Sequence, residues 1–429
     1  MDQQIDTELT RIENAKVAIR EAIIERGGQV PEDALLSTYA EYVLALPSDG
    51  ASQPDFTTHS DAYLAYKQRG NDEYAYITDS SYIEQLAAGN GGDTLANAWE
   101  IWFAPKVSEL TQITTLSNFL YTYSDGASGV SQSVSYTRVE GLQYFTSVTT
   151  LGERFMGSSG GGTMLVWPIQ LPPNLVTIGN YFMTYHQFYD FAFDFPTTLT
   201  SIGSYFLQGC SAYNQPIQLP SGLTSLGDSF LNGLNNFNQP VVLPNSLTEL
   251  PVGSFSNMPK FNSPITFPDS LVSIGADSFY SLSTFNQPIT LPDSVITLER
   301  NFLSQCPEFN SPLHLSDSLE TLGTGFMDYA QAFNYPLELP ATLTTITAEF
   351  GEGRFMQSAE NFTGPLTINN PNFPFTYGGG SVNVNGVLST YSPDAPIYTE
   401  GVTLQGEGAQ AWKDQCPDRM APYRKLIVA

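Results

Sequence analysis

Three aspartates and one asparagine recur at a fixed spacing in this chain of 429 residues, and their chemistry suits a cation. The four residues lie 24 positions apart: Asn245, Asp269, Asp293 and Asp317. In stacked repeats they would form one column, with like charges about 5 Å apart that repel one another. A Ca²⁺ ion bound between layers by carboxylate oxygens would relieve that repulsion. Asp and Asn are also ordinary turn residues, so the column predicts either a weak calcium site or a row of turns.

A second polar column carries amides. It holds asparagine at six successive repeats: Asn214, Asn238, Asn262, Asn286, Asn310 and Asn334. A ladder of amides could hydrogen-bond a sugar, so glycan binding is one interpretation. Asn side chains also bond to nearby backbone groups in turns. The second property favours inward-facing amides that satisfy the backbone at each corner of the repeat.

Residues that usually carry catalysis are scattered along the chain. The three histidines share no metal-ligand spacing with a cysteine: His59, His186 and His314. No nucleophile elbow, phosphate-binding loop or zinc-binding helix motif occurs. We therefore expect no enzyme, no catalytic residue and no cofactor, apart from the weak possibility of calcium at Asp269, Asp293 and Asp317.

Charge narrows the class of partner. The chain has 16 Lys and Arg against 43 Asp and Glu, for a net charge of −27. Nucleic acids and anionic membranes attract surfaces rich in lysine and arginine. Between residues 175 and 366 the only basic residues are Lys260, Arg300 and Arg354. We expect no nucleic-acid partner, and a carbohydrate-cleaving site would also lack the basic groups it needs beside its carboxylates.

The cysteines do not predict a disulfide. Cys210 and Cys306 are four repeats of 24 residues apart. Stacking at roughly 4.8 Å per layer would separate them by about 19 Å, whereas a disulfide needs Cα atoms within about 7 Å. We expect both to be unpaired apolar residues in turns, and Cys416 to be a lone thiol.

Two kinds of segment are not predicted. No apolar run approaches the roughly 18 residues that a membrane-spanning helix needs. Residues 1–6 (Met-Asp-Gln-Gln-Ile-Asp) carry neither the basic nor the apolar region of a secretory signal. We therefore expect neither membrane insertion nor a signal peptide.

A repeat of 24 residues must position all of these columns. Its first apolar anchor recurs eight times: Leu175, Leu199, Leu223, Leu247, Leu271, Val295, Leu319 and Leu343. A second anchor follows each after three residues: Ile178, Ile202, Leu226, Leu250, Ile274, Leu298, Leu322 and Ile346. A fixed period of this length is typical of stacked solenoids. A solenoid offers a long surface, which favours binding over a single catalytic pocket.

Each repeat reads as one coil. Ile289 and Leu291 alternate with Thr290, which predicts a short strand with one buried face. Aromatic residues fill the centre of the coils: Phe182, Phe206, Phe230, Phe255, Phe279, Phe302, Phe326 and Phe350. Proline recurs seven positions before most first anchors, and because it cannot donate to a strand ladder those sites must be corners. Residues 365–368 (Pro-Leu-Thr-Ile) repeat the strand pattern five residues late.

Composition divides the chain into four regions. We predict a small helical anchor or oligomerisation segment over residues 1–50. Residues 51–108 are expected to form an N-terminal cap, in which residues 99–103 (Trp-Glu-Ile-Trp-Phe) look buried. Residues 109–368 predict a solenoid of about ten coils, and residues 369–429 an irregular C-terminal cap. Terminal coils must hide their apolar face, which is why caps are expected.

The anchor is expected to contain two amphipathic helices, over residues 6–26 and 31–46. Two helices of this size bury too little surface to stand alone. They either associate with copies of themselves or another protein, which predicts a homo-oligomer, or fold back on the rest of the chain.

Short motifs recur in the repeats: Asn-Gln-Pro-Ile at 214–217 and 286–289, Asn-Gln-Pro-Val at 238–241, and Leu-Thr-Ser-Ile-Gly at 199–203. These motifs resemble the repeats of BspA-like leucine-rich surface proteins. The resemblance implies a leucine-rich-repeat solenoid of short parallel strands. It also implies adhesion to a protein or a glycan.

The N-terminus resembles a different class. Residues 7–16 (Thr-Glu-Leu-Thr-Arg-Ile-Glu-Asn-Ala-Lys), continuing to Tyr39 and Ala40, are similar to the start of many phage tail and virion proteins. That resemblance implies a protein made in the host cytoplasm and assembled into a particle. Residues 1–50 would then bind other virion proteins.

Together these features lead to a first hypothesis and two alternatives. The first is a phage virion protein of the tail-fibre, baseplate or head-decoration type, whose solenoid binds a host surface protein or glycan. The alternative is a bacterial cell-surface adhesin of the BspA type, and a glycan-active enzyme is the third. The ligand, the binding face and the number of copies do not follow from the sequence.

Overall fold

The computed structural model divides the chain into two compact units, residues 1–60 and 61–429. The residues it describes are 53–68, 71, 73–90, 95, 98–121, 123–124, 131–132, 136–158, 165–347, 355–356, 359, 361–362, 364–370, 402–410 and 426–428. The helices expected over residues 6–26 and 31–46 lie outside these ranges, so the helical anchor stays a prediction. The four-region division and the total number of coils stay predictions as well.

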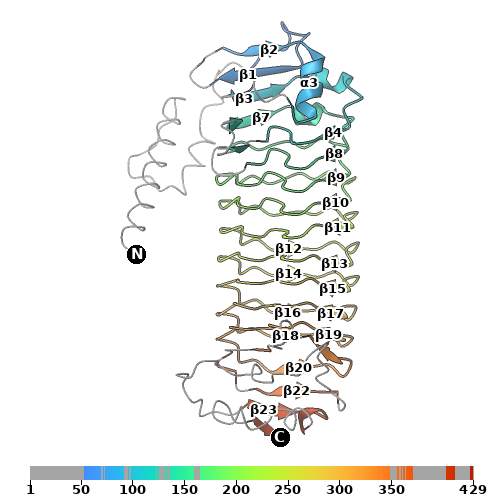
Figure 1. Ribbon diagram of the computed structural model, residues 1–429, viewed down its shortest axis with the longest axis vertical. Helices are drawn as coiled ribbons and strands as arrows, with labels where there is room; N and C mark the ends of the chain where they lie inside the picture. The colour runs from blue at the N-terminus through green and yellow to red at the C-terminus, as the bar shows by residue number, and fades with distance from the viewer. Residues whose placement is uncertain are drawn as a thin grey trace, which may run out of the picture. The chain divides into compact units, whose positions relative to one another are not determined.

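The second unit begins with a small α/β cap (Figure 1). Its elements are β1 (Leu64–Gln68), β2 (Ala75–Ile77), α3 (Ser80–Ala87), β3 (Ala98–Phe103) and β7 (Arg138–Glu140). The sheet order is β2-β1-β3-β7, with β1 antiparallel to β2 and β3, and β3 parallel to β7. The Asp79 side chain accepts from the Ser81 N–H at 2.9 Å and caps α3.

Short elements lie along the chain between the cap strands and the first solenoid strands. They are η2 (Pro105–Glu109), η3 (Leu142–Tyr144) and the antiparallel pair β5 (Tyr123–Ser124) and β6 (Ser131–Gln132). Ile101 and Phe103 are buried, whereas Trp99 and Trp102 are half-buried. Ala98 and Glu100 are buried as well, so the segment predicted as buried is a strand that is buried along most of its length, with the two tryptophans partly exposed.

The second anchors lie in short strands that form two parallel sheets along one side of the solenoid. One contains β4 (Thr115–Leu116), β8 (Thr150–Leu151), β9 (Thr177–Ile178), β10 (Ser201–Ile202) and β11 (Ser225–Leu226). The other contains β13 (Glu249–Leu250), β15 (Ser273–Ile274), β17 (Thr297–Leu298), β19 (Thr321–Leu322) and β21 (Thr345–Ile346). Ser273 pairs with Thr297, one period later. The predicted stack of short parallel strands is confirmed.

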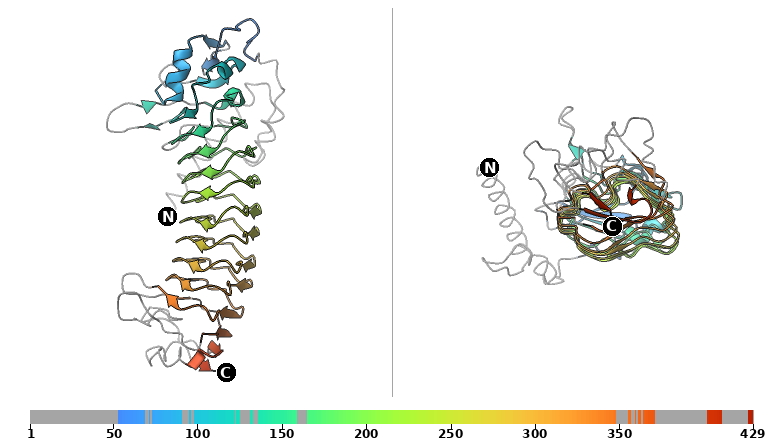
Figure 2. Two further views of the ribbon diagram at one scale, coloured as in Figure 1. Left: turned by 90° about the vertical axis from the view of Figure 1, so that its right-hand side faces the viewer. Right: turned by 90° about the horizontal axis from the view of Figure 1, so that it is seen from below.

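A second column of strands lies on another side of each coil. Its members are β12 (Val241–Val242), β14 (Ile265–Thr266), β16 (Ile289–Thr290), β18 (Leu313–His314), β20 (Leu337–Leu339), β22 (Leu366–Ile368), β23 (Val402–Gln405) and β24 (Leu426–Val428). Leu337 pairs with Leu366, so the segment that repeats five residues late does continue the column. Seen along the stack, the coils of the unit overlie one another (Figure 2).

The recurring prolines stand immediately before these second strands. Proline lacks an N–H, but its carbonyl still accepts a hydrogen bond. Val241 donates its N–H to the Pro264 carbonyl at 3.2 Å, and Ile289 donates to Pro312 at 3.0 Å. The residue that cannot donate thus occupies a position where only an acceptor is needed, which agrees with the predicted corner.

Two aromatic ladders fill the interior. The predicted one contains buried, stacked rings, such as Phe182 and Phe206 at 5.2 Å between centroids. Phe355 stacks on Phe326 at 5.4 Å and continues this ladder, while Phe350 lies outside the described residues. The second ladder lies beyond the sequence prediction and consists of Tyr189, Tyr213, Phe237, Phe261, Phe285, Phe309, Phe333 and Phe362.

The bend after each first strand has an unusual backbone. Alternate residues adopt the left-handed conformation, for example Tyr205 at φ 61° and Leu207 at φ 58°. Tyr205 donates its N–H forward to the Asp228 carbonyl at 2.9 Å, whereas Leu207 donates back to Phe182 at 3.1 Å. The bend therefore bonds to both neighbouring coils. The hydrogen bonds offset a conformational cost of roughly 1 kcal/mol or more per non-glycine residue.

Candidate functional site

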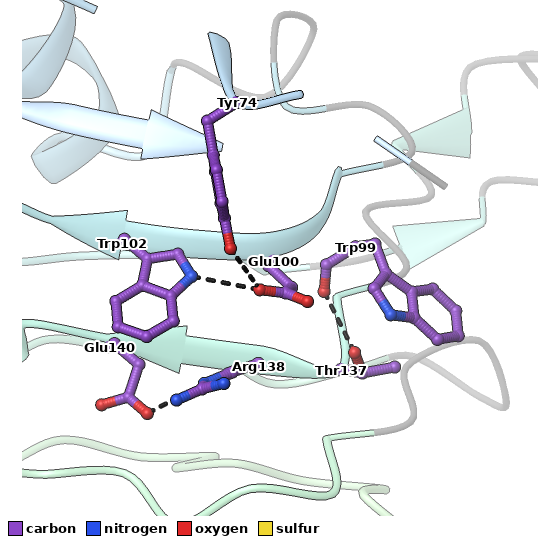
Figure 3. Close-up of polar contacts among 7 residues, drawn as sticks. All are labelled: Tyr74, Trp99, Glu100, Trp102, Thr137, Arg138 and Glu140. Atoms are coloured by element: carbon purple, nitrogen blue, oxygen red, sulfur yellow. Dashed lines mark hydrogen bonds and ion pairs between the residues drawn. The ribbon is translucent and has the colours of Figure 1, made fainter. Parts of the chain in front are cut away.

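Strands β3 and β7 of the cap sheet carry a polar cluster around Glu100 (Figure 3). Glu100 is only 6% exposed. Its carboxylate accepts from the Tyr74 hydroxyl at 2.7 Å and from the Trp102 indole N–H at 3.2 Å. Burial, and then the hydrogen bond to Glu100, raise the pKa of Tyr74. The phenol therefore stays protonated and keeps donating to the carboxylate.

Arg138 lies beside this cluster, opposite Glu100 in the β3–β7 register. Its guanidinium carbon is 4.3 Å from the centroid of the Trp102 ring and 4.2 Å from that of Trp167. Its Nε atom is 3.0 Å from the Glu140 carboxylate. Aromatic faces and a carboxylate thus compensate the charge of a half-buried arginine.

The cap cluster has the character of a closure. Neighbouring side chains hold both Glu100 and Arg138, and the Arg138 side chain is only 20% exposed. Arg138 lies between the rings of Trp102 and Trp167 and so joins the cap strands to residue 167, which precedes the next coil. The cluster therefore covers the end of the stack, as expected for a cap, and offers little to a ligand.

A second arginine lies in a more open row on the bend of the N-terminal coils. The Arg154 guanidinium is 5.7 Å from the Tyr121 ring centroid and 5.5 Å from that of Tyr181. Tyr181 in turn stacks on Tyr205 at 4.8 Å, with ring planes 5° apart. Arg154 is 42% exposed and also pairs with Glu153 at 2.9 Å. This row presents aromatic and charged groups that an external partner can reach.

Glycine makes room for a further tyrosine next to this row. A Cβ atom at Gly209 would overlap the ring of Tyr185, which lies across it. The Tyr185 side chain is 38% exposed. Periodicity alone could not find the row, because the tyrosines occupy repeat positions that carry Ser229, Gly233 and other small residues in the following coils. Arg-aromatic interleaving on an acidic chain is the signal that could have found it.

The predicted calcium column is on the surface. Asp269, Asp293, Asp317 and Asn245 are all exposed. In the described part of the chain no group of three or more His, Cys, Asp and Glu side chains is arranged to hold a metal ion. The column places single carboxylates on successive coils, and calcium binding there stays a prediction.

The asparagine column forms a ladder with the backbone. Each Oδ1 atom accepts from the N–H of the next asparagine, as in Asn238 to Asn262 and Asn262 to Asn286, both at 2.8 Å. The ladder starts at Asp190, which accepts from the Asn214 N–H at 2.8 Å. The backbone role was predicted correctly, but the inward orientation was wrong. The side chains lie at the surface because the N–H groups they satisfy project along the outside of the corner.

Among the described residues, one histidine and two cysteines, residue types that can carry chemistry, lie in the interior. His186 is fully buried, and His59 and His314 lie in other parts of the chain. Cys210 and Cys306 are buried and unpaired, as predicted. Burial raises the pKa of both thiols to about 12. These are inert core thiols, and Cys416 lies outside the described residues.

Parallel strands one period apart, an apolar interior and exposed polar columns define a repeat solenoid with a long outer surface. Residues 163–281 and 258–350 match the family model described as the BspA type leucine rich repeat region, in six copies. Residues 163–350 are thus similar to BspA-type leucine-rich repeats. No helix within the described residues combines the length and apolar character needed to cross a membrane.

Solved structures include three similar leucine-rich proteins. A leucine rich cell surface protein from Faecalibacterium prausnitzii is 16% identical with a TM-score of 0.36, covering 52% of this chain and 59% of its own. A leucine-rich repeat protein from Bacteroides ovatus is 16% identical with a TM-score of 0.27, covering 74% and 94%. One from Eubacterium ventriosum is 12% identical with a TM-score of 0.28, covering 63% and 80%. No curated protein matches the chain.

Proposed function

We propose that this chain is a non-catalytic binding protein of a bacterial cell surface. Its leucine-rich solenoid would present an outer face to a protein or a glycan. The observation that carries the proposal is the BspA-type repeat over residues 163–350, whose coils stack in register. BspA-like proteins are the surface class that these repeats resemble.

The distribution of perturbed groups supports binding over catalysis. In an enzyme, strongly shifted pKa values gather in a cleft where substrate can reach them. Among the described residues of the solenoid, such shifts occur at core groups: Tyr136, His186, Tyr189, Cys210, Tyr213 and Cys306. Burial is the largest cause at each of them. These groups belong to the core, so recognition would use the exposed columns of side chains on the surface.

The virion hypothesis depends on residues 7–40, which lie outside the described residues. The repeats favour the cell-surface alternative, so that alternative is the proposal. Immunogold labelling of intact producing cells and of particles released on lysis separates the two. We expect gold on the cell envelope. Gold on purified particles, with a bare envelope, would reject the proposal in favour of a virion protein.

The binding face can be located with substitutions taken from the repeat itself. Val242, 62% exposed, lies on the second strand column; Glu338 occupies the same repeat position. Val272 lies immediately before β15 of the first strand column, where Glu320 is the equivalent residue. Val242→Glu and Val272→Glu should therefore leave the fold intact. If the solenoid binds, one of them should weaken adhesion of the purified protein to immobilised matrix proteins or glycans.

A third variant probes the bend, and completes the set. Tyr329→Gln takes its residue from Gln305 at the same repeat position. Each variant acts as the control for the other two, because all three keep the repeat's own residue types. Two results would contradict binding through the folded solenoid. One is that none of the three substitutions changes adhesion, and the other is that heat-unfolded protein adheres equally well.

A further inference from the structure

We propose that Tyr205 and Asp228 form a docking point for an arginine side chain on a basic segment of a partner protein. The inference rests on the proposed binding function and gives the chemistry of one part of its ligand. Its observations lie on the bend of the N-terminal coils, where the aromatic row ends.

The row has a direction. Arg154 belongs to the coil before Tyr181, and Tyr205 belongs to the coil after it, so the order along the stack is Arg154, Tyr181, Tyr205. The protein's own guanidinium covers the first face of this tyrosine pair, at 5.5 Å from the Tyr181 centroid. The rings then cover one another at 4.8 Å. One end of the stack is therefore closed by a cation.

The other end lacks such a cover. Among the described residues, Tyr205 has a ring partner only in Tyr181, and no cation lies over its ring. The next residues at its repeat position are small, Ser229 and then Gly253. At Gly233, on the same bend, an added Cβ would meet no atom within 4 Å. The stack thus stops at a step where the following coils carry little side-chain bulk.

A carboxylate stands at this step. Asp228 lies in the coil that follows Tyr205, and its carbonyl accepts the Tyr205 N–H at 2.9 Å. The Asp228 side chain is exposed. Further along the same bend, Arg300 of one coil reaches Asp277 of the coil before it at 3.2 Å. The bend therefore already brings a guanidinium and a carboxylate together across adjacent coils.

Charge selects the occupant. An aromatic face attracts cations, and the net charge of −27 steers them to the surface. A planar guanidinium can lie on the ring and donate to a carboxylate in the same pose, whereas an ammonium is a strongly hydrated point charge. The arrangement at Tyr181 shows the same preference within the chain. Arginine on a partner protein is thus the ligand that this site fits.

The test uses a short peptide of glycine–arginine repeats, blocked at both ends, and its lysine counterpart. Binding to the full chain is measured by fluorescence anisotropy at physiological salt. Tyr205→Asn and Asp228→Asn should each weaken binding of the arginine peptide roughly fivefold, the change that about 1 kcal/mol produces. Both asparagines occur naturally at these repeat positions, as Asn301 and Asn180.

Matched controls separate the site from general charge. Tyr329→Asn changes an exposed tyrosine that has the same left-handed backbone as the half-buried Tyr205, φ 60° against 61°. Asp269→Asn removes one exposed charge from a different column. We expect neither control to change the dissociation constant. Equal losses in site and control variants would show general attraction to an acidic surface and overturn the proposal.

Two further outcomes also decide it. Equal binding of the lysine peptide, lost in the same variants, would overturn the assignment to arginine. Tyr205-dependent binding of a neutral oligosaccharide, with no effect on the peptide, would make the row a glycan site instead. Because the peptide assay needs no cell surface, its failure leaves the adhesion and gold-labelling results intact, and failure of those leaves the peptide result intact.

Discussion

The Nε2 atom of His186 lies 2.6 Å from the carbonyl oxygen of Met156 in the preceding coil. The imidazole is fully buried, and its Nδ1 atom has no hydrogen-bond partner among the described residues. Nε2 must donate to the carbonyl, so this contact assigns the proton of the neutral ring to Nε2. Burial outweighs this hydrogen bond and lowers the pKa of His186 to about 4.

A pH-dependent loss of stability follows from this buried ring. Because the folded pKa lies below the ordinary value of about 6.5, the unfolded chain binds the extra proton first as the pH falls. Stability is therefore complete above about pH 6.5 and declines towards pH 4, by on the order of 3 kcal/mol from this residue. Urea denaturation across this range measures the decline.

The control comes from the repeat. Met258 occupies the position of His186 three coils later in the stack, so His186→Met keeps an apolar core without a titrating group. Carboxylates also titrate near pH 4, and they do so equally in both proteins. The wild-type curve should therefore fall more steeply than that of the variant. Parallel curves would contradict a neutral, buried His186.

Sequence periodicity predicted the parts of this fold that repeat. An apolar anchor at fixed spacing, such as Leu271 to Val295, leaves the chain few ways to bury its side chains other than stacking. The late strand at Leu366 was also recognisable, because its alternation of apolar and polar residues is intact. The surface role of the Asn ladder was not, since residue type indicates a hydrogen bond but not the direction in which the N–H group points.

The functional candidates lie where the repeat is interrupted or decorated. Glu100 and Arg138 meet through a mixed sheet whose pairing joins distant segments, and no periodic signal encodes such pairing. Tyr205 occupies a repeat position filled by Ser229 in the next coil, so the row has no period of its own. Single-sequence reasoning averages over coils, and a site made by the differences between coils escapes it.

The asparagine ladder predicts a local loss of protection. Asn262→Ala removes the Oδ1 that accepts from the Asn286 N–H at 2.8 Å. Water can replace it at this exposed corner, so the free energy of unfolding should fall by only about 0.5–1 kcal/mol. Hydrogen exchange of the Asn286 amide should accelerate at the same time. Mass-resolved exchange on peptides that contain residue 286 checks this.

Aspartate supplies the control for that change. Asp190 already accepts from the Asn214 N–H at 2.8 Å at the head of the ladder, so Asn262→Asp should retain the protection of Asn286. If alanine and aspartate accelerate exchange equally, the Oδ1 contact is not what holds this amide. If neither does, the ladder contributes nothing at this coil.

Glycine substitutions separate backbone strain from steric overlap. Gly233 has φ 75° and open space around a built Cβ, so Gly233→Ala should cost only the left-handed penalty, about 1 kcal/mol. A Cβ at Gly227 would fall against the backbone nitrogen of Ser204 in the preceding coil. Gly227→Ala should therefore cost roughly 1–3 kcal/mol, because a coil must shift.

Gly222→Ala is the reference for both changes. Gly222 lacks a positive φ, and its Cβ would meet only the Thr197 carbonyl at 3.8 Å. Alanine there should be neutral or stabilise slightly, by reducing the freedom of the unfolded chain. Chemical denaturation should rank the three variants 222, 233, 227 in rising cost. The order would be contradicted if residue 227 tolerated alanine as well as residue 222 does.

The exposed aspartate column distinguishes repulsion from calcium binding. Asp293 lies between Asp269 and Asp317 on successive coils, and Asn245 shows that the repeat accepts an amide there. If the carboxylates only repel, Asp293→Asn should raise the melting temperature slightly at low salt, and salt should erase the gain because it screens exposed charges. A chelator should then leave the melting temperatures of both proteins unchanged.

If calcium bridges the coils, a chelator should instead lower the wild-type melting temperature and not that of the variant. Because no group of three acidic or metal-binding side chains converges within the described residues, we expect the first result in differential scanning calorimetry.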